Sequence, residues 1–126
     1  RSAFHGTSEA AIAGGIMRVD IRPDDSGCDV VWTAPERVPA VVGKLSTNGL
    51  LYFYTFEQQA DGDNAWYFLA LDFVTGTPVF KQFIGLGQHF DINWGSPAIA
   101  TDGTVYLGII EGILAIGDAS PGPLGE

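Results

Sequence analysis

The stretch Gly95–Gly108, GSPAIATDGTVYLG, places two short apolar runs on either side of an Asp-Gly pair. Asp102 and Gly103 are residue types that tolerate the positive φ angles of a type I′ turn, so this pair predicts a β-hairpin. A second segment, Val38–Tyr54, has a similar order of proline, apolar run, Asn-Gly pair and aromatic-rich run. The sequence therefore predicts that the hairpin is one unit of a structural repeat.

Short apolar runs rich in Val, Ile, Tyr and Phe extend along most of the chain and are bounded by turn residues. Such runs predict strands, and Gly, Pro or a β-branched residue interrupts every candidate helix. The expected strands are Gly15–Ile21, Val30–Thr33, Val38–Val42, Leu50–Tyr54, Trp66–Phe73, Pro78–Phe83, Ser96–Ala100, Thr104–Gly108 and Gly112–Asp118. We therefore expect an all-β fold with about nine strands and no helix.

The strand order repeats with a period of about fifty residues, from Asp20 to Asp72 to Asp118, with about four strands per unit. This period is typical of β-propeller blades. We interpret the chain (1–126) as one propeller-like segment of about two and a half four-stranded antiparallel blades. It divides into a blade part at 12–36, a full blade at 37–86, a blade part at 94–118 and a tail at 119–126. A β-sandwich built from regular hairpins is the alternative fold.

The segment Ala70–Phe80, ALDFVTGTPVF, resembles the tryptophan-docking pattern of quinoprotein-type β-propellers, the PQQ-like repeat family. In that pattern Ala-x-Asp is followed by a glycine turn and by an aromatic residue four positions after the glycine. The matching residues are Ala70, Asp72, Gly76 and Phe80, with Asp20, Gly27 and Trp32 in an earlier copy that has a longer turn. We expect Asp72 to accept backbone N–H bonds, Gly76 to supply the backbone conformation of the turn, and the aromatic to pack between adjacent sheets. Phe80 stands where the family has Trp, so the indole N–H is lost there.

Propellers close with about four to eight blades, and this chain supplies fewer. Edge strands and apolar blade faces would be exposed in an isolated segment of this kind. We therefore expect the chain to be a fragment of a larger protein, or to belong to a ring that other chains complete.

The chain carries 15 acidic and 6 basic residues, which gives a formal net charge of −9. This charge repels phosphate backbones and anionic membrane surfaces, so we expect no nucleic-acid partner. The most apolar stretch, Thr104–Gly117, is too short for a membrane span and contains Glu111. Cys28 is the one cysteine of the chain, so neither an internal disulfide nor a cysteine-based zinc cluster can form.

The loops that join the fourth strand of one blade to the first strand of the next lie around one mouth of a propeller's channel. Two segments have this position, Thr33–Arg37 and Ile84–Gly95, and the second is long and polar. Its candidate ligand-binding residues are His89, Asp91, Asn93 and Trp94. His can act as an acid or base, Asp and Asn oxygens suit Ca²⁺, and Trp can stack on a sugar or a flat ring. The alternative is that these residues only form turns and pack on neighbouring sheets.

The acidic segment Ala60–Trp66, ADGDNAW, resembles the start of a calcium-binding loop. An EF-hand loop needs Gly at its sixth position and Glu at its twelfth, where this chain has Trp66 and Asp72. We therefore expect an acidic hairpin tip between two strands.

These observations favour a non-catalytic propeller segment that acts as a scaffold or as an interaction module for a protein or a glycan. The pattern of a serine hydrolase is absent from the sequence, and so is that of a dinucleotide-binding loop. The resemblance implies an alternative, part of a dehydrogenase that uses pyrroloquinoline quinone (PQQ) and Ca²⁺. A third alternative is a sugar-active enzyme or lyase that uses His89. The resemblance also implies a periplasmic or secreted location.

Overall fold

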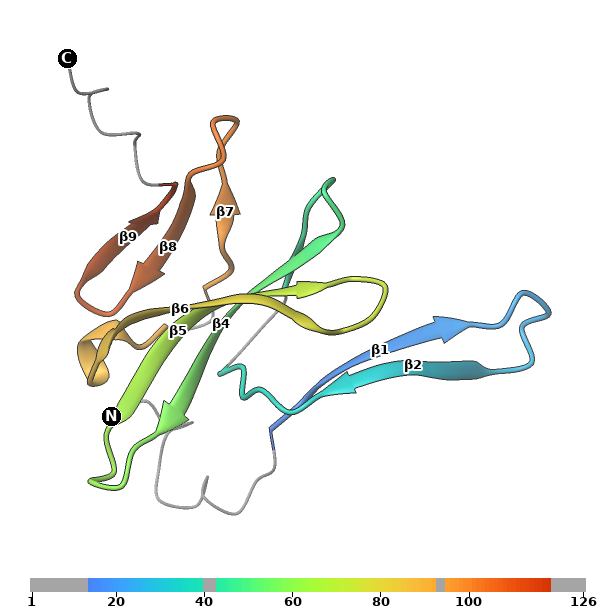
Figure 1. Cartoon of the computed structure of the whole chain (residues 1–126), viewed down its shortest axis with the longest axis horizontal. Helices are drawn as coiled ribbons and strands as arrows, with labels where there is room; N and C mark the ends of the chain where they lie inside the picture. The colour runs from blue at the N-terminus through green and yellow to red at the C-terminus, as the bar shows by residue number, and fades with distance from the viewer. Residues whose placement is uncertain (1–13, 40–42, 93–94, 119–126) are drawn as a thin grey trace.

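The computed structural model describes residues 14–39, 43–92 and 95–118, which form nine strands in three antiparallel sheets (Figure 1). Within these ranges there is no α-helix, and the one helical turn is the 3-10 segment η2 (Gln88–Phe90). The first sheet contains β1 (Ile16–Ile21) and β2 (Cys28–Ala34). The second contains β3 (Lys44–Leu45), β4 (Leu50–Gln58), β5 (Asn64–Asp72) and β6 (Pro78–Leu86). The third contains β7 (Ala98–Ile99), β8 (Val105–Ile109) and β9 (Gly112–Ile116). The predicted all-β, antiparallel class is confirmed, and the described sheets do not close into a ring.

The first strand of the second sheet is shorter and later than the sequence predicts. The expected strand Val38–Val42 is wrong at its start, because Val38 and Pro39 lie outside any strand, and residues 40–42 lie outside the described ranges. Pro39 has no N–H to donate to a strand ladder, which disfavours pairing at its own position, and the strand described next is β3. Val38 instead packs against the hydrophobic core.

The Asn-Gly and Asp-Gly turns are hairpin turns, but their predicted type is wrong. Gly49 and Gly103 have positive φ angles of 79° and 87°, whereas Asn48 and Asp102 are not in this region. A type I′ turn needs positive φ at both central residues, and these loops instead end in a single bulged glycine. The side-chain oxygens of Asn48 and Asp102 each accept the N–H two residues later, at 3.2 and 2.9 Å.

The third sheet repeats the pairing of the second sheet over three strands. Tyr52 lies opposite Ala70 between β4 and β5, and Tyr106 lies opposite Ala115 between β8 and β9. The short strands β3 and β7 pair with the same two tyrosines. The third sheet therefore matches the first three strands of the second, and β6 has no counterpart there among the described residues.

The first sheet matches the last two strands of the second. Trp32 lies opposite Arg18, and Phe80 lies opposite Ala70. The strand register shifts directly after Arg18 in one sheet and directly after Ala70 in the other. The two aromatic residues that the repeat pattern aligns therefore take the same structural position.

Two hydrophobic clusters fill the spaces between successive sheets. Between the first and second sheets lie Trp32, Ala34, Phe53, Leu69 and Leu71. Between the second and third sheets lie Tyr54, Phe56, Trp66, Ile92 and Leu107. Each sheet thus buries a face against the next one.

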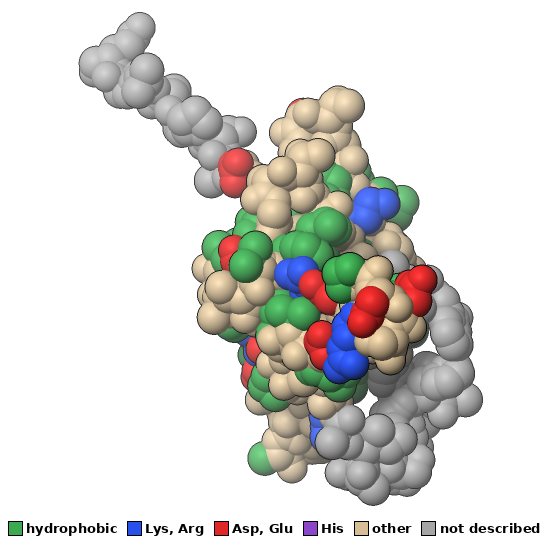
Figure 2. Space-filling view, turned by 90° about the vertical axis from the view of Figure 1, so that its right-hand side faces the viewer, with side chains coloured by type: hydrophobic (Ala, Val, Ile, Leu, Met, Phe, Trp, Pro, Cys, Tyr) green, Lys and Arg blue, Asp and Glu red, His purple; other side chains and the backbone are tan. Residues whose placement is uncertain are grey.

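The outer faces of the first and third sheets remain exposed and partly apolar. On the first sheet the exposed fractions are 57% for Met17 and 46% for Val19. On the third sheet they are 45% for Tyr106 and 75% for Ile113. Figure 2 looks from the side on which the β1–β2 hairpin lies, and it shows hydrophobic side chains at the surface among acidic and basic ones. Exposed apolar sheet faces of this kind are typical of surfaces that a partner covers.

Candidate functional site

The first sheet docks on the turn that joins β5 to β6 through Trp32. The indole Nε1–H of Trp32 donates a hydrogen bond of 3.0 Å to the carbonyl of Phe73. The indole ring packs on Gly76, where an added Cβ would lie 2.5 Å from Cδ2 of Trp32. Gly76 also has a φ angle of +71°, so the turn and the docked ring both favour glycine.

A second side chain of the first sheet, that of Arg18, also donates a hydrogen bond to the Phe73 carbonyl. Nη1 of Arg18 donates to the Phe73 oxygen at 3.0 Å, and its guanidinium lies 4.1 Å from the Phe73 ring centre. Asp20 holds Arg18 through two hydrogen bonds of 2.8 and 2.6 Å. These bonds from Arg18 are the main cause that lowers the pKa of Asp20. Asp20 therefore fixes a docking arginine, whereas its equivalent Asp72 binds a turn.

Asp72 caps the β5–β6 turn as the sequence predicts. Its Oδ1 accepts the N–H groups of Val74 and Thr75 at 2.9 and 2.8 Å, and the Thr75 hydroxyl at 2.9 Å. The bond from the backbone of Thr75 is the main cause that lowers the pKa of Asp72. The turn that presents the Phe73 carbonyl is therefore held by a carboxylate.

We expect the Asp72 cap to make stability depend on pH in the acid range. A carboxyl whose pKa is lowered by folding stabilises the protein above its unfolded pKa of about 4, and this stabilisation is lost as pH falls through the folded pKa. In thermal melts between pH 6 and pH 2.5, the melting temperature of Asp72→Asn should therefore fall less than that of the wild type. Parallel curves for the two proteins would contradict a charged cap.

Two further repeat residues, Gly27 and Phe80, lie in different surroundings. Gly27 has a φ angle of +148°, and the atom nearest to an added Cβ is Nη1 of Arg22, at 3.6 Å. Phe80 is 41% exposed, and its ring centre lies 6.2 Å from that of Tyr52 and 6.0 Å from that of Phe68. The three rings line a cavity of about 500 Å³ that side chains of the third sheet also line.

The start of the long loop after β6 is hydrogen-bonded to a buried tryptophan of β5. Trp66 is fully buried, and its Nε1–H donates to the Gly87 carbonyl at 2.9 Å. Gly87 has a φ angle of +94° and leads directly into η2, which carries His89 at the surface. Nδ1 of His89 lies 2.5 Å from Oε1 of Glu111 in the turn between β8 and β9. The imidazole is therefore paired with a carboxylate that the sequence pattern did not single out.

Asp91 lies in the interior, two residues after the exposed His89. It is 2% exposed, and its carbonyl accepts the N–H of Ile110 at 2.9 Å. Tyr54 donates its hydroxyl to the Phe90 carbonyl at 2.9 Å, and burial, with the charge of Asp91 second, raises the pKa of this tyrosine. Within the candidate set the structure thus separates His89 from Asp91, while residues 93 and 94 (Asn93 and Trp94) lie outside the described ranges.

The pair of His89 and Glu111 is expected to contribute little to stability, because both side chains are more than half exposed. Exposed ion pairs typically contribute about 0–1 kcal/mol. Glu111→Gln should therefore change the free energy of unfolding by less than about 1 kcal/mol in urea titrations at pH 7. A larger loss would show that this pair holds the loop in place.

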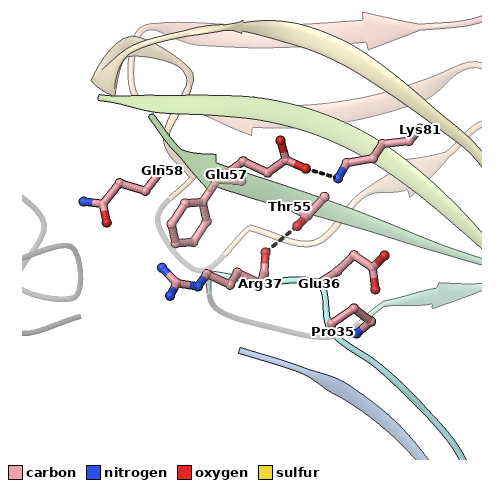
Figure 3. Close-up of a pocket in the computed structure, with 8 residues that line it drawn as sticks. Pro35, Glu36, Arg37, Thr55, Glu57, Gln58 and Lys81 are labelled. Carbon is pink, nitrogen blue, oxygen red and sulfur yellow. Dashed lines mark hydrogen bonds and ion pairs between the residues drawn. The ribbon is translucent and has the colours of Figure 1, made fainter. Parts of the chain in front are cut away.

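The other predicted loop, Thr33–Arg37, lines a polar cavity of about 440 Å³ (Figure 3). The residues around it are Pro35, Glu36, Arg37, Thr55, Phe56, Glu57, Gln58 and Lys81. Nζ of Lys81 lies 2.5 Å from Oε1 of Glu57, and Thr55 donates its hydroxyl to the Arg37 carbonyl at 2.5 Å. Oε2 of Glu36 is buried and has no hydrogen-bond donor within the described ranges. The cavity thus presents charged and polar groups beside the loop that we expect, from the sequence, at the mouth of a propeller channel.

Among the residues that the structure describes, no three His, Cys, Asp or Glu side chains are grouped so that they could hold a metal ion. The acidic segment at 60–66 forms the predicted hairpin tip between β4 and β5, where Oδ1 of Asp61 accepts the N–H of Asp63 at 3.0 Å. No helix in the described ranges is long and apolar enough to span a membrane.

A comparison of the chain with protein-family models and another with curated proteins gave no match. We therefore infer the function from the geometry of these sheets, turns and cavities.

Proposed function

We propose that this chain is a segment of a β-propeller of the quinoprotein-like repeat type, and that it serves as a non-catalytic scaffold that binds a protein or a glycan. The observation that carries the proposal is the docking of Trp32 on the turn of the next sheet, by its bond to Phe73 and its contact with Gly76. Propellers are built from repeated sheets that pack face to face around a centre, and such contacts hold neighbouring sheets in order.

The first sheet exposes a face that corresponds to a buried face of the second sheet. This correspondence supports the proposal that a further sheet packs on that side in the propeller. Met17 and Val19 flank Arg18 as Leu69 and Leu71 flank the equivalent residue of the second sheet. The two leucines are fully buried beneath the first sheet, whereas Met17 and Val19 are about half exposed. A preceding sheet in the same relation would bury Met17 and Val19.

The cavity beside Glu36 supports ligand binding at one end of the sheets. Glu36 lines this cavity, and its carboxylate is a natural acceptor for a ligand hydroxyl, amide or ammonium group. Lys81 and Gln58 also line the cavity and carry N–H donors. This donor and acceptor set suits a sugar or a polar peptide side chain.

The architecture is tested by determining the structure of the complete gene product by crystallography or electron cryo-microscopy. We expect a closed ring in which radial sheets follow one another and the Trp32 contact recurs between neighbours. Two sheets packed as a closed sandwich, with the β1–β2 hairpin paired into one of them, would overturn the proposal.

The interaction role is tested by screening the chain on glycan and peptide arrays and measuring the affinity of the best binder. Glu36→Gln should weaken that binding at least about tenfold, whereas Glu111→Gln, an exposed glutamate outside the cavity, should leave it unchanged. Equal affinities for all three proteins would exclude this cavity as the site. A visible absorbance change and a higher melting temperature on adding PQQ with Ca²⁺ would instead favour the dehydrogenase alternative.

A further inference from the structure

The third sheet ends at β9, whose outer edge pairs with no strand among the described residues. In the second sheet the equivalent strand is β5, and β6 pairs with it on that side. Ala115 of β9 and Ala70 of β5 occupy the same register, because each lies opposite the matching tyrosine of the preceding strand. Within residues 95–118 no strand takes the position in the third sheet that β6 takes in the second.

The backbone of β9 presents hydrogen-bonding groups toward this edge. In the second sheet, Asp72 donates its N–H to Thr77 on the β6 side, and Phe73 donates to Gly49 on the β4 side. Because alternate residues of a strand point the same way, the same register directs the N–H groups of Ala115 and Ile113 toward the edge that pairs with no described strand. A row of such groups is a template for one more strand.

The side chains beside this edge leave a place for an aromatic ring. In the second sheet the Phe80 ring contacts Tyr52 and Phe68, and Phe68 is only 2% exposed. The equivalent residues of the third sheet, Tyr106 and Ile113, are 45% and 75% exposed. A strand with an aromatic residue in the place of Phe80 would cover both.

The β9 edge also lacks the residues that protect other edges from pairing. Strand β6 carries Pro78 and Lys81, and β1 carries Arg18 and Asp20. Gly112–Ile116 contains neither a charge nor a proline. Charged residues and prolines are common means of preventing unwanted strand addition, so this edge is suited to being paired.

We infer that the edge of β9 binds one extended antiparallel strand of a polypeptide, which places an aromatic side chain opposite Ala115 and against Tyr106 and Ile113. Backbone hydrogen bonds supply the affinity of such strand addition, and contact of the aromatic ring with the exposed Tyr106 and Ile113 supplies its specificity. The inference rests on the proposed function, because the internal repeat defines the strand position that no described residue of the third sheet takes.

The test uses the whole chain and the peptide GTPVFKQFIGL, which has the sequence of residues 76–86 and so supplies a β6-like strand in trans. We expect saturable binding by fluorescence anisotropy and slower amide exchange at Ile113 and Ala115 on addition of the peptide. Ala115→Pro removes one edge donor, and Ile113→Lys alters a side chain that is 75% exposed. Each variant should bind at least about tenfold more weakly, and so should the peptide in which alanine replaces the residue matching Phe80.

The matched control is Ile110→Lys, which changes an isoleucine that is 53% exposed and lies outside β9. It should bind the peptide like the wild type. Absence of binding to the wild type, or equal binding to Ile113→Lys, would overturn the inference, as would a dimer paired through β9 that Ala115→Pro dissociates. None of these outcomes bears on whether the complete gene product forms a ring. The proposed function can therefore stand when the strand-binding inference fails.

Discussion

Trp32→Ala should lower the free energy of unfolding by about 3–5 kcal/mol, the usual cost of removing a large buried aromatic side chain. The indole is 9% exposed and belongs to the cluster between the first two sheets. Its loss also removes the bond to the Phe73 carbonyl and the ring that covers Gly76. Urea unfolding followed by circular dichroism measures the loss, and hydrogen exchange should show β1 and β2 opening first.

Two further variants separate the contributions of the ring and of its N–H group. Trp32→Phe keeps an aromatic ring and loses the indole bond, which is typically worth about 1 kcal/mol, and Arg18 still donates to the same carbonyl. Val74→Ala, at a side chain of the same turn that is 68% exposed, should have little effect. A cost of less than about 1 kcal/mol for Trp32→Ala would show that the indole does not hold the two sheets together.

Trp66→Ala is the second large effect that we expect, again about 3–5 kcal/mol. Trp66 is fully buried, and its ring centre lies 5.3 Å from that of Tyr54 and 5.4 Å from that of Phe56. A cavity at this site would weaken the contact between the second and third sheets. Thermal and urea unfolding measure the change.

The Trp66 indole also anchors the start of the long loop, which gives a second measurement. Trp66→Phe keeps much of the packing and removes the bond to the Gly87 carbonyl. Hydrogen exchange in Gln88–Phe90 should then quicken more than exchange in β8, which serves as the internal control. Equal changes in both segments would show that the indole bond does not position the loop.

Apolar runs bounded by turn residues predicted most of the fold, because strand formation here follows from local residue type and alternation. Local signals were insufficient where pairing depends on the partner strand. Val38 and Pro39 lie outside any strand although the local pattern predicted one there. The turn at Asn48 has positive φ only at Gly49, so it is not of the type that its dipeptide predicts. The register of β9 places Gly117, rather than Asp118, in the position of Asp72. A chain-wide period cannot detect a shift of one residue.

The candidate site was predicted less completely than the fold. Sequence spacing grouped His89 with Asp91, but the turn between them sends one side chain to the surface and the other into the interior. Glu111 pairs with His89 from a different hairpin, and only the three-dimensional arrangement brings them together. Glu36 and Arg18 gave no motif signal, although Arg18 precedes the repeat residue Asp20 by two positions.

The carbonyl of Phe73, which accepts bonds from both Trp32 and Arg18, has a consequence for the order of folding. Trp32 and Phe73 are 41 positions apart, so the acceptor is synthesised well after its donor. The β5–β6 turn must form before the carbonyl points at the first hairpin, and contacts between distant residues form slowly. We therefore expect the β1–β2 hairpin, which is synthesised before β5 and β6, to dock on them only after the β5–β6 turn has formed.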